Sequence, residues 1–437
     1  MQKRIEEIAK KFLERIKDKE VYILSHHDTD GITSAAIMIK TLQKLDKKFS
    51  VQIVKVLEEQ TIYNLPKEKV IVFLDLASGS LDYIAKSGLK DVFIIDHHEI
   101  IQKIPENIEI INPELHDKQE ISASGLTYLF CKEIIPDVEL AKLATLGMIG
   151  DMLGKNIDKV NNQILNEGEV KRKRGLMLYP STRPLNKVLE FSSNPYIPGV
   201  TGNLNGVNEL LREAGILPKE GKYKSLIELD EQEMSKLVTS ILLRMSKANS
   251  KDLIGDIFLI KFFNKLEDAR ELSAVINACS RLGESEIAIQ LCLEIPKAKK
   301  KAEALYAKYK RFIISGLEFV SKTEKIQGKG YIIINAKNEI KDTIIGTIAS
   351  ILSHSSLYEE GTIVVAMAYD KDKIKVSSRN VGRNGRNVRE ILDLVVSKTG
   401  GEVGGHEFAA GCLIEKHKEE EFVEHLKNSL EFELVKV

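Results

Sequence analysis

The chain carries two short clusters in which aspartates and histidines stand almost side by side. The first cluster lies in the stretch SHHDTDG and consists of His26, His27, Asp28 and Asp30. The second lies in IIDHHE and consists of Asp96, His97 and His98. Crowded carboxylates raise one another's pKa and cost stability unless a positive charge lies among them. A bound cation is therefore the simplest chemical explanation of such clusters.

Both clusters stand where predicted strands end. The runs VYILS, SVQIVKVL, VIVFLDL and DVFIIDHH have strand length, are rich in Val and Ile, and alternate with helical patterns. Because their apolar residues are continuous, these strands should be buried on both faces, which indicates a mainly parallel sheet of βαβ units. Asp75 follows the run VIVFL, and Asp151 ends the small-residue helix LATLGMIG.

The topology of a parallel sheet should bring these residues together. The carboxyl ends of its strands line one crevice, and ligands bind there. We therefore expect convergence of strand-end residues that are far apart in sequence: Asp28, Asp30, Asp75, His97 and His98. Carboxylates with one or two imidazoles and no thiolate suit Mn²⁺ or Mg²⁺ better than a structural zinc. The number of ligands favours two divalent cations, which together are a general device for hydrolysing phosphoesters.

Each of these residues has an ordinary structural explanation when it is taken alone. An aspartate after a strand is usually a helix cap, and a single histidine is usually a satisfied structural residue. The weight comes from the combination of D-x-D-G, D-H-H and a further strand-end aspartate, Asp75, in order within one βαβ region.

Composition narrows the class of protein. A chain of 437 residues exceeds one ordinary core, and 64 basic against 64 acidic residues give no net charge, so a site for a polyanion must be a local surface. The four cysteines form no C-x-x-C pair, which argues against a zinc finger and a disulfide framework. The charged amphipathic N-terminus is no signal peptide, and no apolar run has the length of a membrane span. These features favour a cytoplasmic protein without membrane contact.

The chain divides by pattern into three parts. Residues 1–190 should form the metal-site domain, residues 191–322 a loop-rich and helical connector, and residues 323–437 a smaller α/β domain. We interpret the basic tract Lys171–Arg174 as a solvated loop. The lysine-rich run 297–324 predicts one long helix, which either tracks a phosphate backbone while Tyr306 and Tyr309 stack on bases or serves only as a connector.

The last part contains residues suited to binding phosphate. Guanidinium groups and exposed backbone N–H groups are what phosphate oxygens need. The stretch KVSSRNVGRNGRNVREIL carries four arginines, Arg379, Arg383, Arg386 and Arg389. We favour Arg379, which follows a predicted strand and two serines. In GGEVGGHEFAAG, a helix that begins at His406 would offer its amides to an anion, and the alternative is an ordinary turn.

The motifs resemble those of a known family. SHHDTDG, FLDLAS, IIDHHE and GMIGDM resemble, in order, the four motifs of the DHH phosphoesterase superfamily, and VGGHEFAAG resembles the signature of the DHH-associated C-terminal domain. Together with VINACSRLG, they make the chain most similar to the archaeal RecJ-like exonucleases. One departure is Val403, which stands where this family usually has a third adjacent glycine.

The resemblance implies a role for each motif residue. One metal would be held by His26, Asp28 and Asp75. The other would be held by Asp30, Asp75, His97 and Asp151, with Asp75 as the bridge. His98 would face the scissile phosphate or support it, and Asp96 would orient the pair. Whether His26 or His27 binds metal stays open. Substrate would be bound by Ser378, Arg379, Gly404, Gly405 and His406, together with His98.

The resulting hypothesis is a two-metal phosphodiesterase, an exonuclease that releases mononucleotides from single-stranded DNA or RNA. One alternative is a DHH phosphoesterase for short substrates such as RNA oligomers, cyclic dinucleotides or polyphosphate. The other alternative is a replication-fork subunit that binds the GINS complex, with secondary or no nuclease activity. The presence of all the expected carboxylates favours an enzyme.

Overall fold

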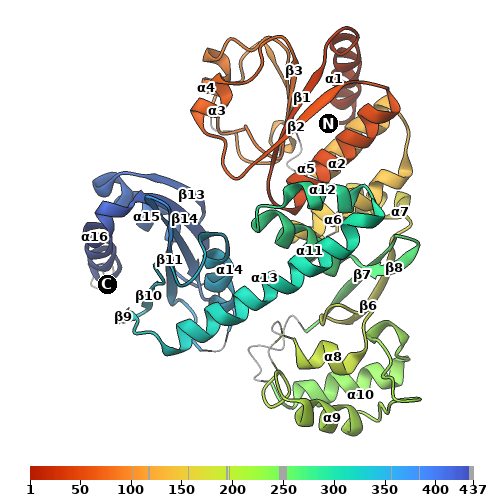
Figure 1. Ribbon diagram of the computed structural model, residues 1–437, viewed down its shortest axis with the longest axis vertical. Coiled ribbons are helices and arrows are strands. Elements are labelled where there is room, and N and C mark those ends of the chain that lie inside the picture. Colours follow the sequence, from red (N-terminus) through yellow and green to blue (C-terminus); the bar gives the residue numbers. More distant parts are fainter. Residues whose placement is uncertain are drawn as a thin grey trace. The chain divides into compact units, whose positions relative to one another are not determined.

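The structure is a computed structural model that describes residues 1–432 except 101, 117–118, 156, 193–194, 196, 246–252, 356 and 383. The chain splits into two compact units, Met1–Tyr306 and Ala307–Val437, and each unit is described by itself (Figure 1). Within the described residues, no helix has both the length and the apolar character that crossing a bilayer requires.

A five-stranded parallel sheet lies at the centre of the first part of unit 1. The strands run in the order β2-β1-β3-β4-β5. Their bounds are β1 (Val21–His26), β2 (Phe49–Val54), β3 (Val70–Leu74), β4 (Val92–Ile95) and β5 (Ile108–Ile111). All four neighbouring pairs are parallel, and β3 and β4 are buried throughout. The predicted parallel sheet is therefore confirmed.

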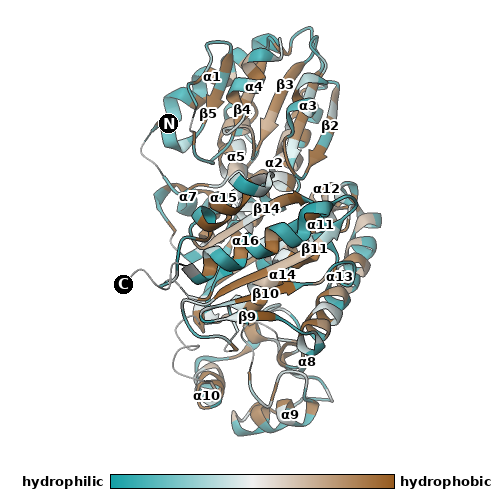
Figure 2. Cartoon of the chain, turned by 90° about the vertical axis from the view of Figure 1, so that its left-hand side faces the viewer, coloured by the Kyte–Doolittle hydropathy of each residue, from teal (hydrophilic) through white to brown (hydrophobic). Residues whose placement is uncertain are grey.

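Helices cover both faces of this sheet. On one face, Ile23 and Val72 share a core with α1 (Gln2–Arg15), α2 (Thr29–Lys44), α5 (Ala123–Ile134) and α6 (Ala141–Gly150). On the other face, Leu24 and Phe73 pack with α3 (Glu59–Tyr63) and α4 (Leu81–Lys86). Neighbouring residues of a strand point to opposite faces, so continuous apolar runs fill both cores. The hydropathy colouring shows β3 and β4 as apolar between more polar helices (Figure 2).

The basic tract Lys171–Arg174 is not a loop, which corrects our interpretation. It lies in β6 (Lys171–Leu176), which pairs with β7 (Ile254–Phe262) in an antiparallel sheet completed by β8 (Lys265–Asp268). Two of its charges have local partners: Lys173 Nζ donates to the carbonyl groups of Ile227 and Leu229, and Arg172 pairs with Asp256. Partners of this kind let a basic sequence form a strand.

The rest of unit 1 is mainly helical. Helix α7 (Lys159–Glu167) follows the metal-site motifs. A small separate core forms around α8 (Leu185–Glu190), α9 (Leu204–Glu213) and α10 (Glu231–Leu242). Helices α11 (Ala269–Arg281) and α12 (Ser285–Cys292) pack instead into the core of α2 and α6. The long helix expected at 297–324 is present as α13 (Pro296–Lys322).

The stacking role considered for Tyr309 is wrong. Its side chain is buried, and its hydroxyl lies 2.8 Å from Thr347 Oγ1. Tyr306 is half-buried and packs against the core of unit 1. Of the two interpretations of this basic helix, base stacking through Tyr309 is therefore excluded, whereas exposed lysines such as Lys300 and Lys301 remain on its surface.

Unit 2 is a six-stranded mixed sheet in the order β13-β14-β12-β11-β10-β9. The strands are β9 (Ile326–Gly328), β10 (Tyr331–Asn335), β11 (Ile363–Asp370), β12 (Lys373–Asn380), β13 (Glu402–His406) and β14 (Ala409–Glu415). Helix α14 (Asp342–Ser353) packs on β11 and β12. Helices α15 (Val388–Thr399) and α16 (Glu419–Phe432) share a core with alternate residues of β12, such as Ile374 and Val376.

We expect Phe12→Ala to destabilise unit 1 by about 3–5 kcal/mol, because removing a buried aromatic ring leaves a cavity. Phe12 is fully buried, and its ring meets Phe93 and Phe130 at centroid distances of 5.1 and 5.4 Å. Urea unfolding followed by circular dichroism measures the change. Phe191→Ala is the matched control, because Phe191 is 65% exposed. Equal losses in the two variants would contradict this assignment of the core.

Candidate metal centre

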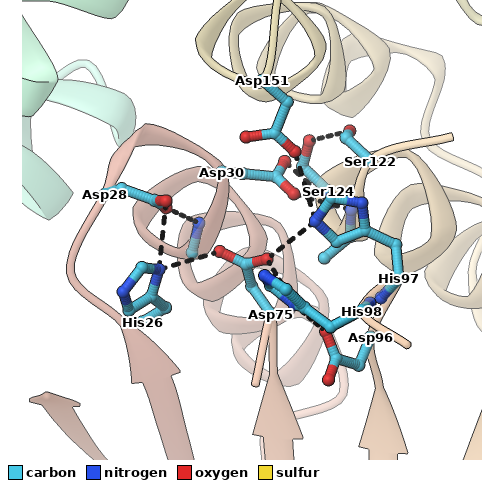
Figure 3. A network of polar contacts seen from close by, with 12 residues as sticks. His26, Asp28, Asp30, Asp75, Asp96, His97, His98, Ser122, Ser124 and Asp151 are labelled. Atoms are coloured by element: carbon cyan, nitrogen blue, oxygen red, sulfur yellow. Dashed lines mark hydrogen bonds and ion pairs between the residues drawn. The ribbon is translucent and has the colours of Figure 1, made fainter. Parts of the chain in front are cut away.

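Side chains from five separate stretches meet beyond the carboxyl ends of β1, β3 and β4 (Figure 3). His26 ends β1, Asp28 and Asp30 lie at the start of α2, Asp75 and His97 follow β3 and β4, and Asp151 follows α6. Parallel strands put these positions at one edge of the sheet. The tertiary structure thus brings together strand-end residues that are up to 125 positions apart, His26 and Asp151 being the outermost.

The turn between β1 and α2 is tight. A Cβ atom on Gly31 would lie 2.3 Å from the carbonyl oxygen of His26, so only glycine fits there. Asp28 is the N-cap of α2 and accepts a hydrogen bond from Gly31 N at 3.0 Å through Oδ1. Its Oδ2 lies 3.0 Å from His26 Nδ1. Asp28 is therefore both a helix cap and part of the cluster.

Asp75 occupies the middle of the cluster and is only 2% exposed. Its backbone is in the left-handed region with φ 59°, a conformation that costs energy in a residue with a Cβ. Burial and the negative charges of Asp28 and Asp30 raise the pKa of Asp75 to about 7. Positive charge nearby is needed to stabilise the ionised form of this carboxyl group.

Two histidines supply that charge in the structure as it stands. His26 Nδ1 lies 3.3 Å from Asp75 Oδ2, and His97 Nε2 lies 3.3 Å from Asp75 Oδ1. His97 Nε2 is also 3.3 Å from Asp151 Oδ2, so it links two carboxylates. Burial alone would lower the pKa of His97, but the close contact with the Asp75 carboxylate and the charge of Asp30 outweigh it and raise the pKa to about 9.

Asp96 and His98 form a separate, well-defined pair. His98 Nδ1 lies 2.7 Å from Asp96 Oδ1, and this hydrogen bond raises the pKa of His98. Asp96 also accepts hydrogen bonds from the backbone amides of His97 and Ser78. Burial would raise the pKa of Asp96, but these contacts, with that to His98 foremost, hold the pKa below its ordinary value. Asp96 thereby fixes the loop that carries both histidines.

The residues of the cluster fit divalent cations. Asp75 Oδ1 and Asp151 Oδ2 are buried and make no hydrogen bond, although His97 Nε2 lies 3.3 Å from each of them. Buried polar atoms normally have a hydrogen-bond partner, and one imidazole ring shared by two carboxylates leaves room for further positive charge. Three groups of residues could each hold a cation, because within each group the ligand atoms lie within 4.8 Å of one another. The groups are Asp75, His97 and His98; His26, Asp28 and Asp75; and Asp30, His97 and Asp151. An all-oxygen-and-imidazole set of this kind suits Mn²⁺ or Mg²⁺.

The structure separates the two adjacent histidines whose roles the sequence left open. The ring of His26 meets Asp28 and Asp75 through Nδ1. His27 Nδ1 lies 3.1 Å from His26 Nε2, and no cation-ligand set among the described residues includes His27. These contacts favour His26 as the ligand.

The motifs did not include the residues that hold Asp30. The backbone amides of Ala123 and Ser124, at the start of α5, donate to its two carboxylate oxygens. In the sequence this segment reads SASG and indicates only a helix start with a serine cap. A helix start gives no sign of which distant carboxylate it will meet. The sequence therefore indicated the helix start but not its contact with Asp30.

In unit 2, the expected helix at His406 is wrong. His406 ends β13, and two residues turn the chain into β14. The backbone amides of paired strands already serve the sheet, so they are not free for an anion as helix N-terminal amides would be. The glycines of this segment belong to the hairpin.

The hairpin nevertheless brings His406 to the row of Arg379. Arg379 pairs with Ala409, which pairs with His406, and residues directly opposite one another share a face of the sheet. Gly404 lies on the same face, where a Cβ atom would meet nothing within 4 Å, and both Gly404 and His406 are exposed. The part of this face at Gly404 and His406 is therefore accessible to a ligand, whereas α14 covers the part at Ser377.

Ser378 and Gly405 lie on the opposite face. Each of them is directly opposite Ala410 in the sheet, and Ala410 belongs to the core under α15 and α16. Ser377, rather than Ser378, therefore accompanies Arg379. The guanidinium group donates to Ser350 Oγ through Nε and to the Ser378 carbonyl group through Nη1.

The other arginines are dispersed. Arg383 lies outside the described residues. Arg389 Nη1 donates to the carbonyl oxygen of Gly405 at 3.1 Å and thereby supports the hairpin. Arg386 is half-buried, and its carbonyl oxygen accepts a hydrogen bond from Asn380. Of the arginines that the structure describes here, Arg379 keeps the best position for phosphate.

Comparison with protein families identifies three regions. Residues 20–150 match the DHH family N-terminal domain, residues 178–255 the DHH-CID domain and residues 328–431 the DHHA1 domain. An uncharacterized protein from Methanocaldococcus jannaschii is 30% identical over 444 residues, which cover 97% of this chain and 96% of that protein. The chain therefore belongs to the DHH superfamily and is a RecJ-like protein.

A second curated relative is the single-stranded-DNA-specific exonuclease RecJ of Bacillus subtilis. It is 26% identical over 168 residues, a match that covers 35% of this chain and only 21% of that protein. The match thus extends over about a fifth of this relative's length.

Solved structures share the fold. A RecJ exonuclease bound to manganese is 17% identical with a TM-score of 0.61, and 98% of this chain and 94% of that chain are covered. RecJ from Thermus thermophilus in complex with Mg²⁺ is 17% identical, with a TM-score of 0.56 and coverage of 97% and 52%. CDC45 from Entamoeba histolytica is 12% identical, with a TM-score of 0.68 and coverage of 98% and 99%.

We expect His26→Ala to weaken Mn²⁺ binding by more than about tenfold, because even outer residues of metal sites contribute 10- to 100-fold in affinity. His27→Ala is the matched control and should change affinity little. Calorimetric titration of each folded variant with Mn²⁺ measures the difference. A larger loss in the His27 variant would reverse the assignment of the two histidines.

Proposed function

We propose that the protein is a two-cation phosphodiesterase that degrades single-stranded nucleic acid from one end and releases mononucleotides. The observation that carries this proposal is the convergence of four aspartates on one site in which Asp75 Oδ1 and Asp151 Oδ2 are buried, make no hydrogen bond and share a single imidazole, that of His97. DHH family members are metal-dependent phosphoesterases, and the fold is shared with a RecJ exonuclease bound to manganese.

We assign the ligands to two sets that share Asp75. One cation would be held by His26, Asp28 and Asp75, and the other by Asp30, Asp75, His97 and Asp151. This assignment is supported by the candidate groups His26, Asp28 and Asp75 and Asp30, His97 and Asp151, and by the 3.3 Å between His97 Nε2 and Asp75 Oδ1. Divalent cations in such a site polarise a phosphoryl oxygen and lower the pKa of a water molecule. Because Asp75 presents one oxygen to each half of the cluster, it suits the bridging position.

His98 is placed to act on the substrate rather than to bind a cation. Its Nδ1 is engaged by Asp96, which leaves Nε2 as the second ring nitrogen, and its side chain is 56% exposed. The raised pKa of His98 favours the protonated ring. We infer that Nε2–H donates to an oxygen of the scissile phosphate and stabilises the charge that builds there.

The exposed part of this face of unit 2 would bind the nucleic acid. Arg379 and His406 would hold a phosphate, and Gly404 would let the ligand approach the backbone closely. Ser377 lies on the same face but is buried against α14, so it takes no part in this binding.

The test is digestion of single-stranded DNA and RNA, labelled at either end, with Mn²⁺, with Mg²⁺ and with EDTA. We expect cation-dependent release of mononucleotides from one end. We expect no hydrolysis by Asp75→Asn, because this change removes the negative charge of the one ligand that the two cations would share. Asparagine tolerates the left-handed backbone of position 75, so this variant should fold. Equal activity of the variant would reject the bridging role.

The same digestion separates the two alternatives. Hydrolysis of di- to pentanucleotides without cleavage of long strands would assign the protein to short substrates. Cation binding without any cleavage would favour a replication-fork subunit that contacts GINS, a possibility that the fold shared with CDC45 motivates.

Arg379→Ala should raise KM for a long strand by about 10- to 100-fold and change kcat little, since losing a charged hydrogen bond costs roughly 1.5–3 kcal/mol. Lys373→Ala is the matched control, because Lys373 is an exposed cation at the other end of β12. Steady-state kinetics on labelled strands measures both constants. An unchanged KM in the Arg379 variant would remove this residue from the binding face.

A further inference from the structure

The carboxylate of Asp30 is held by the start of α5, a helix outside the metal-site motifs (Figure 3). Ala123 N donates to Asp30 Oδ2 at 2.6 Å, and Ser124 N donates to Asp30 Oδ1 at 3.0 Å. Asp30 is fully buried and lies in the first turn of α2. Its carboxylate group therefore meets the positive ends of two helices at once.

The first turn of α5 has a partner for each of its leading amides. The amides of Ala123 and Ser124 go to Asp30, and Gly125 N donates to the Oγ of the N-cap residue, Ser122, at 3.2 Å. Such amides have no acceptor within the helix itself. Asp30 thus completes the capping of α5, and α5 in return fixes the orientation of Asp30.

A chain of hydroxyl groups ties this helix start to α6. Ser124 Oγ donates to the carbonyl oxygen of Ala144 at 3.2 Å. Ser122 Oγ and Ser124 Oγ are 3.0 Å apart, and because the Ser124 proton is used, Ser122 is the donor between them. The hydrogen bonds therefore run in one direction from Gly125 to α6, and they hold the two amides in place for Asp30.

Helix α6 leaves room for the carboxylate at one position. A Cβ atom on Gly147 would lie 2.2 Å from Asp30 Oδ1 and 2.1 Å from Ser124 Oγ. No flexible group could move far enough to relieve both contacts, since Asp30 and Ser124 are fully buried. Glycine at this position is therefore required by the contact between Asp30 and α5.

We propose that the start of α5 is the positioning element of the second cation site, the one formed by Asp30, His97 and Asp151. The inference rests on the proposed two-cation function. An ionised carboxylate offers about four lone pairs, and the two amides use two of them, which leaves one on each oxygen for a cation. Ala123 and Ser124 touch neither cation nor substrate, so they act only through Asp30.

Ala123→Pro tests the proposal, because it removes one of the two amides. Ala123 is the first residue of α5, a position that accepts proline, and Ser122 before it has the extended backbone that proline requires. The proline ring would occupy the place of the N–H group that Asp30 contacts. In a Mn²⁺ titration followed by electron paramagnetic resonance, we expect two sites in the unaltered protein and a loss of about 10- to 100-fold in the affinity of one site in the variant.

A control and a second variant complete the design. Lys159→Pro places proline at the first residue of α7, where Lys159 is exposed, and should leave both sites intact. Gly147→Ala displaces Asp30 from the side of α6, although alanine itself favours helix over glycine. It should weaken the same single site, and thermal unfolding shows whether each variant is folded.

The outcomes distinguish the positioning role of α5 from the proposed two-cation function. Two unaltered Mn²⁺ sites in folded Ala123→Pro or folded Gly147→Ala would overturn the positioning role and leave the proposed function intact. No Mn²⁺ binding by the unaltered protein would overturn both. Selective loss of one site in either variant supports the positioning role, whatever the activity on nucleic acid.

Discussion

The crowding of four carboxylates at one edge of the parallel sheet is the constraint on which the rest of this site depends. Asp75 is almost wholly buried between Asp28 and Asp30, and repulsion there must be offset by positive groups. The protein supplies three kinds of compensation. His26 and His97 contribute imidazole rings, the starts of α2 and α5 contribute backbone amides, and bound cations, as proposed, would complete the charge balance at the oxygens of Asp75 and Asp151 that make no hydrogen bond. Close packing makes this possible, since Gly31 and Gly147 remove the Cβ atoms that would keep the chain apart.

The two units carry opposite kinds of chemistry, and each has its own core. Unit 1 concentrates negative charge at strand ends, which suits cations. Unit 2 presents Arg379 and His406 in one row of its sheet, with Gly404 on the same face, which suits phosphate. A phosphodiesterase needs both, because its substrate is an anion that must be bound and also neutralised.

The fold is shared with a RecJ exonuclease and with CDC45, and a fold by itself does not fix an activity. Apolar residues such as Ile23, Val72 and Phe73 determine the sheet and its two cores, and they are chemically independent of the side chains at the strand ends. A chain can therefore keep the fold while its strand-end residues change. In this chain the strand-end residues gather into groups that could hold cations, and for that reason the proposal is an enzyme.

The sequence by itself determined the parallel sheet and the positions of the acidic strand ends, because continuous apolar runs can be buried in few other ways. It also predicted α13 from its helical pattern. Only the tertiary structure decided which of His26 and His27 meets Asp75, that Ser377 rather than Ser378 shares a face with Arg379, and that α5 holds Asp30. The tertiary structure also corrected two local expectations. Lys171–Arg174 forms a strand through its pairing with β7, and His406 ends a strand instead of starting a helix. The reason is common to all of these cases. Local pattern reports how a segment buries its own apolar residues, whereas pairing, facing and capping depend on partners that are distant in sequence.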